Sequence, residues 1–303
     1  MLTRSLFLSL ANNKTAEHIV KSNPLSRRMT SRFVAGESIS DVVTTVKNLN
    51  ALGADASVDL LGESVTKPEE VEQTVSTYLQ LIQAVRTNNL RTTVSVKLTA
   101  LGLDIDANLC RASMIRLLEA ANPDIFIQID MEGTPHTERT LELFYALRQD
   151  YTNVGAVIQA YLFRSEADIE KLISIQARVR LCKGAYNEPP SLAFPLKTDV
   201  DTNYLKLMHP LIEKGNYPGF ATHDPIIIEQ IKAYAKSQNL PNNRFEFQML
   251  YGIRRDLQTQ LVQNGYNLTV YTPFGTHWYP YFMRRLAERP ANIWFVLKSL
   301  LKG

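Results

Sequence analysis

Short runs of apolar and β-branched residues recur along the chain from residue 54 onward, and longer amphipathic segments separate them. Such runs are typical of strands that are buried on both faces of a parallel sheet. Each interval has room for one helix and two loops. The eight predicted strands are Ala54–Leu61, Thr92–Leu98, Ile125–Met131, Val154–Tyr161, Arg178–Cys182, Phe220–His223, Arg244–Leu250 and Leu268–Tyr271.

The segments between these runs carry apolar residues at the spacing of an amphipathic helix. Glu69–Arg86 brings Val71, Val75 and Tyr78 onto one stripe, and Pro68 stands where a first helical turn tolerates proline. The same pattern predicts helices at Ser40–Leu52, Asn108–Ala121, Glu138–Asp150, Asp168–Gln176 and Ile226–Gln238.

Alternating strands and helices predict a parallel sheet with helices outside it. Eight strands in a chain of 303 residues favour closure into a (β/α)8 barrel of the TIM type. An open doubly wound sheet is the alternative, which the lack of a G-x-G-x-x-G motif after the first strand disfavours. We expect an N-terminal helical arm over residues 1–38 and one barrel over residues 39–303 that includes a C-terminal helix.

The net charge of +3 is too small to indicate a nucleic-acid-binding protein. The excess sits in the arm, because residues 1–32 hold six basic residues and one acidic residue. Such an arm could be a mitochondrial targeting segment, but helices packed on the barrel are the preferred interpretation. No apolar run approaches the roughly 20 residues of a membrane-spanning helix.

Two cysteines, Cys110 and Cys182, supply neither a disulfide framework nor a metal-binding spacing. A reducing, cytoplasmic location is therefore expected. His223 has no histidine or cysteine cluster near it in the sequence, so we expect no metal site.

A barrel of this type carries its active site at the carboxyl ends of its strands. Polar side chains stand at that end of all eight predicted strands. Alone, His223 could be a core histidine and Lys97 an ion-pair partner of Asp130; together, the residues predict a site on one rim. They are Glu63, Lys97, Asp130, Glu132, Gln159, Tyr161, Arg180, Lys183, Thr222, His223, Glu246, Gln248 and Tyr271.

The segment after the eighth strand predicts one helical face, with Tyr281, Arg284, Arg285 and Glu288 at positions i, i+3, i+4 and i+7. Paired guanidinium groups suit a carboxylate or a phosphate. A solvated charged face is the alternative interpretation, but this helix begins at the rim.

The strand ends, read in order, resemble a known family. The motifs are Leu61-Gly62-Glu63, Lys97-Leu98-Thr99, Asp130-Met131-Glu132, Gln159-Ala160-Tyr161, Arg180-Leu181-Cys182-Lys183-Gly184-Ala185-Tyr186, Ala221-Thr222-His223, Phe245-Glu246-Phe247-Gln248 and Tyr281-Phe282-Met283-Arg284-Arg285. This series resembles the proline dehydrogenase family, and in particular its monofunctional, FAD-dependent bacterial members.

The resemblance implies oxidation of L-proline to Δ1-pyrroline-5-carboxylate by hydride transfer to FAD, the first step of proline degradation to glutamate. It also implies electron transfer to a membrane quinone. Asp130 and Arg180 would be catalytic, with Asp130 paired to Lys97, and Glu63 would form a gate with Arg284. Substrate would contact Lys97, Tyr271, Tyr281, Arg284 and Arg285. FAD would contact Met131, Gln159, Arg180, Lys183, Gly184, Ala185, Thr222, His223, Gln248 and Glu288.

Asp224 follows His223 where longer members of this family often have asparagine. Three other functions stay open at this stage. Lys97 or Lys183 would permit Schiff-base chemistry in a lyase or aldolase. A folate-reductase-like flavin barrel and a non-catalytic membrane-surface module are the other two.

The apolar C-terminal segment, residues 291–303, could pack on the barrel or lie on a membrane surface, and packing is preferred. A peripheral position on the inner face of the bacterial cytoplasmic membrane would suit a quinone-reducing enzyme, and a mitochondrial matrix location is less favoured. Crowding by Tyr281 favours proline over hydroxyproline. The oligomeric state stays open.

Overall fold

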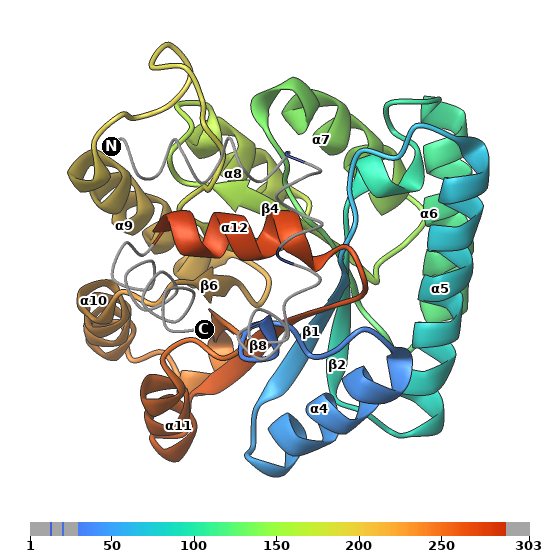
Figure 1. Cartoon of the computed structure of the whole chain (residues 1–303). Coiled ribbons are helices and arrows are strands. Elements are labelled where there is room, and N and C mark those ends of the chain that lie inside the picture. Colours follow the sequence, from blue (N-terminus) through green and yellow to red (C-terminus); the bar gives the residue numbers. More distant parts are fainter. Residues whose placement is uncertain (1–12, 14–19, 21–29, 289–303) are drawn as a thin grey trace.

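The computed structural model describes residues 13, 20 and 30–288 and shows eight parallel strands closed into a barrel (Figure 1). Each strand pairs with the next, and β8 closes the ring against β1. The (β/α)8 prediction is confirmed, and every predicted strand is present with its ends at or within a few residues of the predicted ones. The strands are β1 Asp55–Leu60, β2 Thr92–Val96, β3 Ile127–Ile129, β4 Val154–Gln159, β5 Arg178–Cys182, β6 Gly219–Ala221, β7 Glu246–Leu250 and β8 Asn267–Phe274.

Helices form a ring outside the strands (Figure 1). They are α4 Ile39–Ala51, α5 Pro68–Thr87, α6 Ala107–Ala121, α7 Thr134–Arg148, α8 Ser165–Ser174, α9 Lys197–Lys214, α10 Pro225–Ser237, α11 Arg255–Gln263 and α12 Trp278–Glu288. All six predicted outer helices are present. The pattern missed α9, which contains Pro210, and α11, whose nine residues carry a narrow apolar stripe around Leu257 and Leu261.

Two helices depart from a regular barrel. Helix α4 contacts β1, β8 and α5, and so it takes the outer position that belongs to the helix after β8. Helix α12 is thereby released to cross the carboxyl end of the barrel, where Tyr281 lines the same cavity as the strand-end residues (Figure 1). The fold thus puts the predicted arginine helix over the expected site.

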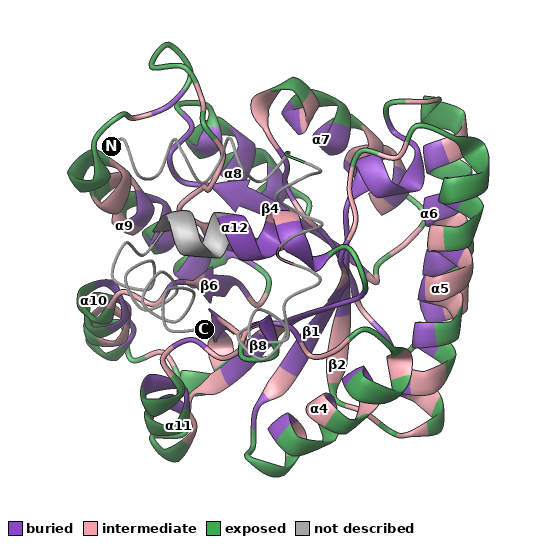
Figure 2. Cartoon of the chain, viewed as in Figure 1, coloured by how far each residue is buried: buried purple, intermediate pink, exposed green. Residues whose placement is uncertain are grey.

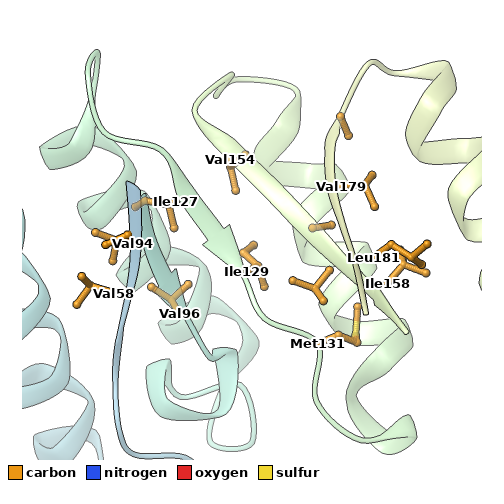
Figure 3. Packing of buried hydrophobic residues seen from close by; sticks show 14 of the residues in the cluster. Val58, Val94, Val96, Ile127, Ile129, Met131, Val154, Ile158, Val179 and Leu181 are labelled. Carbon is orange, nitrogen blue, oxygen red and sulfur yellow. The ribbon is translucent and has the colours of Figure 1, made fainter. Parts of the chain in front are cut away.

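The barrel has two kinds of interior. Between sheet and helices lies an apolar layer, which includes Val58, Val94 and Ile129 (Figure 3). Figure 2 shows the same division, with buried strands and helices exposed on their outer faces. Because side chains alternate along a strand, Val58 packs in this layer whereas Ser57 and Asp59 point into the barrel, where they bind residues of other strands.

The amino-terminal end of the barrel is filled by a hydrogen-bonded cluster. Glu246 accepts bonds from Arg178 Nη2 at 2.9 Å, Gln248 Nε2 at 2.5 Å and Thr269 Oγ1 at 2.7 Å. The Arg178 guanidinium also lies 4.8 Å from the centroid of the Phe126 ring. This cluster packs the interior of the barrel at that end, and Glu246 and Gln248 are interior hydrogen-bonding residues there.

Two predictions fall mainly outside the described residues: most of the N-terminal arm, over residues 1–38, and the segment at 291–303. The boundary near residue 38 stays a prediction. Within the described residues, α4 begins at a capping box in which Ser38 and Asp41 bind each other's backbone N–H groups. None of the helices described has both the length and the apolar character needed to cross a membrane.

Candidate active site

A cavity of about 670 Å³ opens at the carboxyl end of the barrel. This volume is in the range of small-molecule and cofactor sites, about 300–1,000 Å³. Nine residues predicted to contact FAD line it: Met131, Gln159, Arg180, Lys183, Gly184, Ala185, Thr222, His223 and Gln248. So do the predicted substrate residues Lys97, Tyr271 and Tyr281.

Three predicted residues belong to the part of α12 whose side chains are not described. The backbone of Arg284, Arg285 and Glu288 belongs to that helix, in the turns after Tyr281. The helical prediction is therefore confirmed for the segment, and the roles of these three side chains stay predictions.

A buried ion pair occupies the deepest part of the site. Lys97, directly after β2, directs its Nζ to both carboxylate oxygens of Asp59 on β1, at 2.8 Å and 2.7 Å. Asp130, the partner expected for Lys97, lies farther away, with its Oδ2 at 3.8 Å from Nζ. That separation permits an electrostatic attraction but exceeds a hydrogen bond.

Asp130 keeps this predicted ion pair and also forms hydrogen bonds with two other residues of the rim. Its Oδ1 accepts a bond from Arg180 Nη1 at 2.7 Å, and its Oδ2 accepts one from the Tyr271 hydroxyl at 2.7 Å. The Arg180 guanidinium also lies 5.3 Å from the centroid of the Tyr271 ring. Its second nitrogen donates to Ser57 and Ser95 at 2.8 Å and 3.1 Å. Arg180 is therefore held rigidly across the barrel from β5.

Burial and charge perturb these groups in opposite senses. Burial raises the pKa of Asp59 to about 6, against the opposing attraction of Lys97. Burial alone would lower the pKa of Lys97, but the carboxylates of Asp59 and Asp130 outweigh it and raise that pKa above its ordinary value. We infer a charged Lys97, because an unpaired Asp59 carboxylate at this depth would cost several kcal/mol.

This electrostatic state argues against Schiff-base chemistry. A lysine must be neutral to attack a carbonyl group. Lys97 is held charged, and Lys183 Nζ forms ion pairs with Asp201 at 2.5 Å and with Asp224 at 3.1 Å. The lyase or aldolase hypothesis therefore loses both of its candidate nucleophiles.

The loop between β5 and α9 forms one wall of the cavity. Gly184 has a φ of +108°, and a Cβ at this position would lie 2.3 Å from the ring of Tyr161, so only glycine fits. Glu188 fastens the loop to the first turn of α7, where it accepts a bond from the Thr134 N–H at 2.9 Å. It also accepts a bond from the Tyr161 hydroxyl at 3.3 Å.

Several cavity residues use part of their hydrogen-bonding capacity within the barrel. Nε2 of His223 accepts a bond from the Leu250 N–H at 2.8 Å, which assigns the proton of the neutral ring to Nδ1. Gln159 donates to the Glu132 carbonyl at 3.0 Å, and Gln248 donates to Glu246. These bonds fix the orientation of each side chain at the cavity wall.

Arg180 offers one donor that has no acceptor among the described residues. Its Nε is buried and makes no hydrogen bond to any described residue. Leaving such a donor unpaired costs about 1–3 kcal/mol. Because Arg180 lines the cavity, an acceptor atom of a bound molecule would satisfy it.

Glu63, the predicted gate residue, lines a second cavity of about 750 Å³ between the β1–α5 loop, α5 and the start of α12. Lys97 and Tyr281 border both cavities. The gate residue is thus on the side of the site where the first turn of α12 approaches β1. Its pairing with Arg284 stays a prediction.

The two cysteines differ in burial. Among the described residues, no cluster of histidine, cysteine, aspartate or glutamate could hold a metal ion. Cys110 and Cys182 are both free thiols. Cys182 is only half-buried and borders the cavity, and burial of its thiol raises the pKa to about 12.

Three site residues were missed in the sequence. Asp59 had a usable signal, since it is a charge at an inward position of an otherwise buried strand. Tyr186 lies within a quoted motif and lines the cavity, and Glu188 follows two residues later on the same loop. No local pattern marks Glu188, because its partners are 27 and 54 residues away in the sequence.

Comparisons with known proteins identify one family. A family model described as proline dehydrogenase matches residues 42–298. The chain is 41% identical to proline dehydrogenase 2 of Bacillus subtilis (strain 168) over 303 residues, which cover 100% of both chains. It is 38% identical to proline dehydrogenase of Deinococcus radiodurans over 309 residues, covering 100% of this chain and 99% of the other.

A solved structure has the same fold. Proline utilization A (PutA) from Bdellovibrio bacteriovorus, inactivated by N-propargylglycine, superposes with a TM-score of 0.80 at 26% identity. The match covers 90% of this chain and 33% of that one, so the present chain corresponds to about a third of the larger protein.

Proposed function

The chain belongs to the proline dehydrogenase family, whose enzymes act in proline catabolism, and we propose that it oxidises L-proline to Δ1-pyrroline-5-carboxylate with FAD as its cofactor. We further propose that a membrane quinone accepts the electrons. One observation carries the proposal: two cations line the same cavity, Lys97 fixed by Asp59 and Arg180 fixed by Asp130.

Lys97 is the proposed anchor for the proline carboxylate. It is charged and buried, and charge-assisted hydrogen bonds are about twice as strong as neutral ones. Arg284 and Arg285 would complete the anchor from α12, the helix that crosses this end of the barrel. Tyr271 and Tyr281, both on the cavity wall, would flank the ring.

The residues present fit FAD by their donor chemistry. Nε of Arg180, which has no partner among the described residues, would donate to a ring acceptor, and Lys183 on the cavity wall would donate to polar groups of the nucleotide. Gly184, on the cavity wall, lets this loop approach the Tyr161 ring closely. FAD supplies the hydride acceptor that no amino acid side chain can provide.

Within this scheme, the protein orients the substrate and controls its protonation. The cations around the site lower the affinity of the proline amine for a proton and so favour the neutral amine that can release a hydride. Asp130 is held by Arg180 and Tyr271 at the cavity wall, where it would orient the bound substrate and balance the charge of Lys97. Glu63, paired with Arg284, would exclude water.

The electron acceptor and the location in the cell are proposed from family membership alone. A quinone-reducing enzyme must reach the bilayer, so we propose a cytoplasmic protein in peripheral contact with the inner face of the membrane. Residues 291–303 are one candidate for that contact. Deletion of these residues would leave proline-dependent dye reduction intact and abolish quinone reduction in vesicles; unchanged quinone reduction would exclude the segment.

An absorbance spectrum tests the central proposal. Purified protein should show the visible absorbance bands of an oxidised flavin, and adding L-proline under anaerobic conditions should bleach them. Arg284→Met should then raise the KM for proline by about tenfold or more, because it removes a charge-assisted contact. A colourless protein that takes up no FAD, or a KM unchanged within a factor of about two, would contradict the corresponding assignment.

A further inference from the structure

Asp59 is a buried carboxylate beside the proposed substrate anchor, and no role for it follows from the family resemblance. Its side chain is 1% exposed, and both of its oxygens lie within 2.8 Å of Lys97 Nζ. We propose that Asp59 is a positioning residue, which keeps Lys97 charged and directed at the cavity so that the substrate carboxylate meets a cation already in place. This inference rests on the proposed role of Lys97.

A carboxylate facing Lys97 does not use up its binding capacity. An ammonium group has three N–H donors. Asp59 occupies the side of Nζ toward β1, and Asp130 at 3.8 Å is too distant for a hydrogen bond. Among the described residues, Lys97 therefore keeps donor capacity for a ligand, and it borders the main cavity.

Without Asp59, the flexible lysine side chain has an alternative partner within reach. A small rotation would bring Nζ into contact with Asp130, which now binds Arg180 and Tyr271. Lys97 would then lie away from its binding position, and Asp130 would be drawn from its own partners. The substrate would have to break this new pair before it could bind.

The protonation of Lys97 depends on every charged group packed around it. Groups from four segments face it: Asp59 on β1, Glu63 on the β1–α5 loop, Tyr78 on α5, and Asp130 with Glu132 after β3. Asp59 makes the shortest of the contacts to Nζ, so its loss removes the main compensation for burial. The pKa of Lys97 should then fall, toward the alkaline pH values at which binding can be measured.

Loss of Asp59 changes both the net charge of the site and the position of Lys97, and these two changes have opposite effects on substrate binding. Removing one negative charge would by itself strengthen the binding of an anionic substrate. Removing the residue that positions Lys97 would weaken it. We expect the second effect, because a cation that has swung to Asp130 is no longer available to the ligand.

The experiment compares the FAD-loaded, full-length variants Asp59→Asn, Lys97→Met and Asp59→Asn/Lys97→Met with the parent. Asp55→Asn is the matched control, since Asp55 lies on the same strand in an exposed pair with Arg91. The readouts are KM and kcat for proline, and the binding of tetrahydrofuran-2-carboxylate from pH 6 to pH 10. This probe keeps the ring and the carboxylate but lacks the titratable amine.

Asp59→Asn should raise KM and the probe's dissociation constant by about tenfold with a smaller change in kcat. Probe binding should also weaken at alkaline pH in this variant and not in the parent. In the Lys97→Met background, Asp59→Asn should cause no further change, because Asp59 acts only through Lys97. The Asp55→Asn control should match the parent.

A KM that falls or stays within a factor of about two, together with an unaltered pH profile, would overturn the role of Asp59. If Lys97→Met itself leaves KM unchanged, the proposed carboxylate anchor is wrong, which is a separate failure. Should Asp59→Asn not fold, Asp59→Glu answers the question. This variant keeps the negative charge but displaces Lys97. KM should therefore rise, and probe binding should not weaken at alkaline pH. An unchanged KM would refute the proposal.

Discussion

The hydroxyl of Tyr271 gives the most direct test of the network around Asp130. Tyr271→Phe removes the bond of 2.7 Å from this hydroxyl to Asp130 Oδ2. The variant keeps the aromatic ring beside the Arg180 guanidinium, with its centroid 5.3 Å away. The substitution therefore removes the hydroxyl's hydrogen bond to Asp130, together with its interaction with Asp59, and keeps the aromatic ring in place.

The size of the effect follows from burial. A hydrogen bond to a charged group contributes about 1.5–3 kcal/mol net. The Asp130 side chain is 12% exposed and borders the cavity, so water can replace part of the lost bond. We therefore expect a loss of about 1–2 kcal/mol, which corresponds to about a 5- to 30-fold lower kcat/KM for proline.

The assay is proline-dependent reduction of a dye, with KM and kcat determined separately. We expect most of the loss in KM, because a loosened Asp130 can approach Lys97 and compete with the substrate carboxylate. Tyr234→Phe is the control, since the Tyr234 hydroxyl binds Glu213 on the protein surface. A kcat/KM for Tyr271→Phe within a factor of about two of the control would refute the role assigned to this bond.

Three further predictions concern the cofactor loop, the base of the barrel and the cavity thiol. Glu188→Gln removes the negative charge that binds the first turn of α7, so FAD release on dilution, followed by flavin fluorescence, should be about 2- to 5-fold faster. The surface variant Glu166→Gln should match the parent. Equal release rates in the two variants would contradict the role of Glu188 in holding the loop. Glu246→Gln breaks a buried pair worth about 2–4 kcal/mol and should lower Tm by about 3–6 °C. The exposed pair of Asp55 should contribute less than about 1 kcal/mol, so a Tm for Glu246→Gln equal to that of Asp55→Asn would show that the buried pair is dispensable. Because burial raises the pKa of Cys182 to about 12, its reactive thiolate forms only as the pH rises toward that value. At pH 8, iodoacetamide should therefore label Cys182 in unfolded protein and not in native protein. Rapid labelling of native Cys182, seen in peptide maps, would contradict the raised pKa.

The fold was predictable because its signals are local. A strand buried on both faces needs a continuous apolar run, and an outer helix needs an apolar stripe, so both appear within short windows of sequence. The helices that escaped detection, α9 and α11, have a proline or a narrow stripe that weakens this signal. No local signal shows that α4 takes the place of the helix after β8. Its position depends on which part of the outer surface, beside β1 and β8, is left uncovered when the barrel closes.

The strand-end residues that line the cavity were also predictable, because every parallel strand ends at the same rim. Their shortest contacts were not, although the predicted ion pair of Lys97 with Asp130 is present at 3.8 Å. Sequence reasoning paired Lys97 with Asp130, whereas the structure joins Lys97 most closely to Asp59, and Asp130 to Arg180 and Tyr271. These contacts span 38, 50 and 141 residues of sequence.

By itself, then, the sequence determined the strand order, the rim that bears the chemistry and the residue types present there. Only the tertiary structure decided which buried charges neutralise one another. The physical reason is that hydrophobic periodicity is set by the nearest turns of the chain, whereas the pairing of charges depends on the radial direction of each side chain inside the closed barrel. That direction brings Asp59 within 2.7 Å of Lys97 and leaves Asp130 at 3.8 Å.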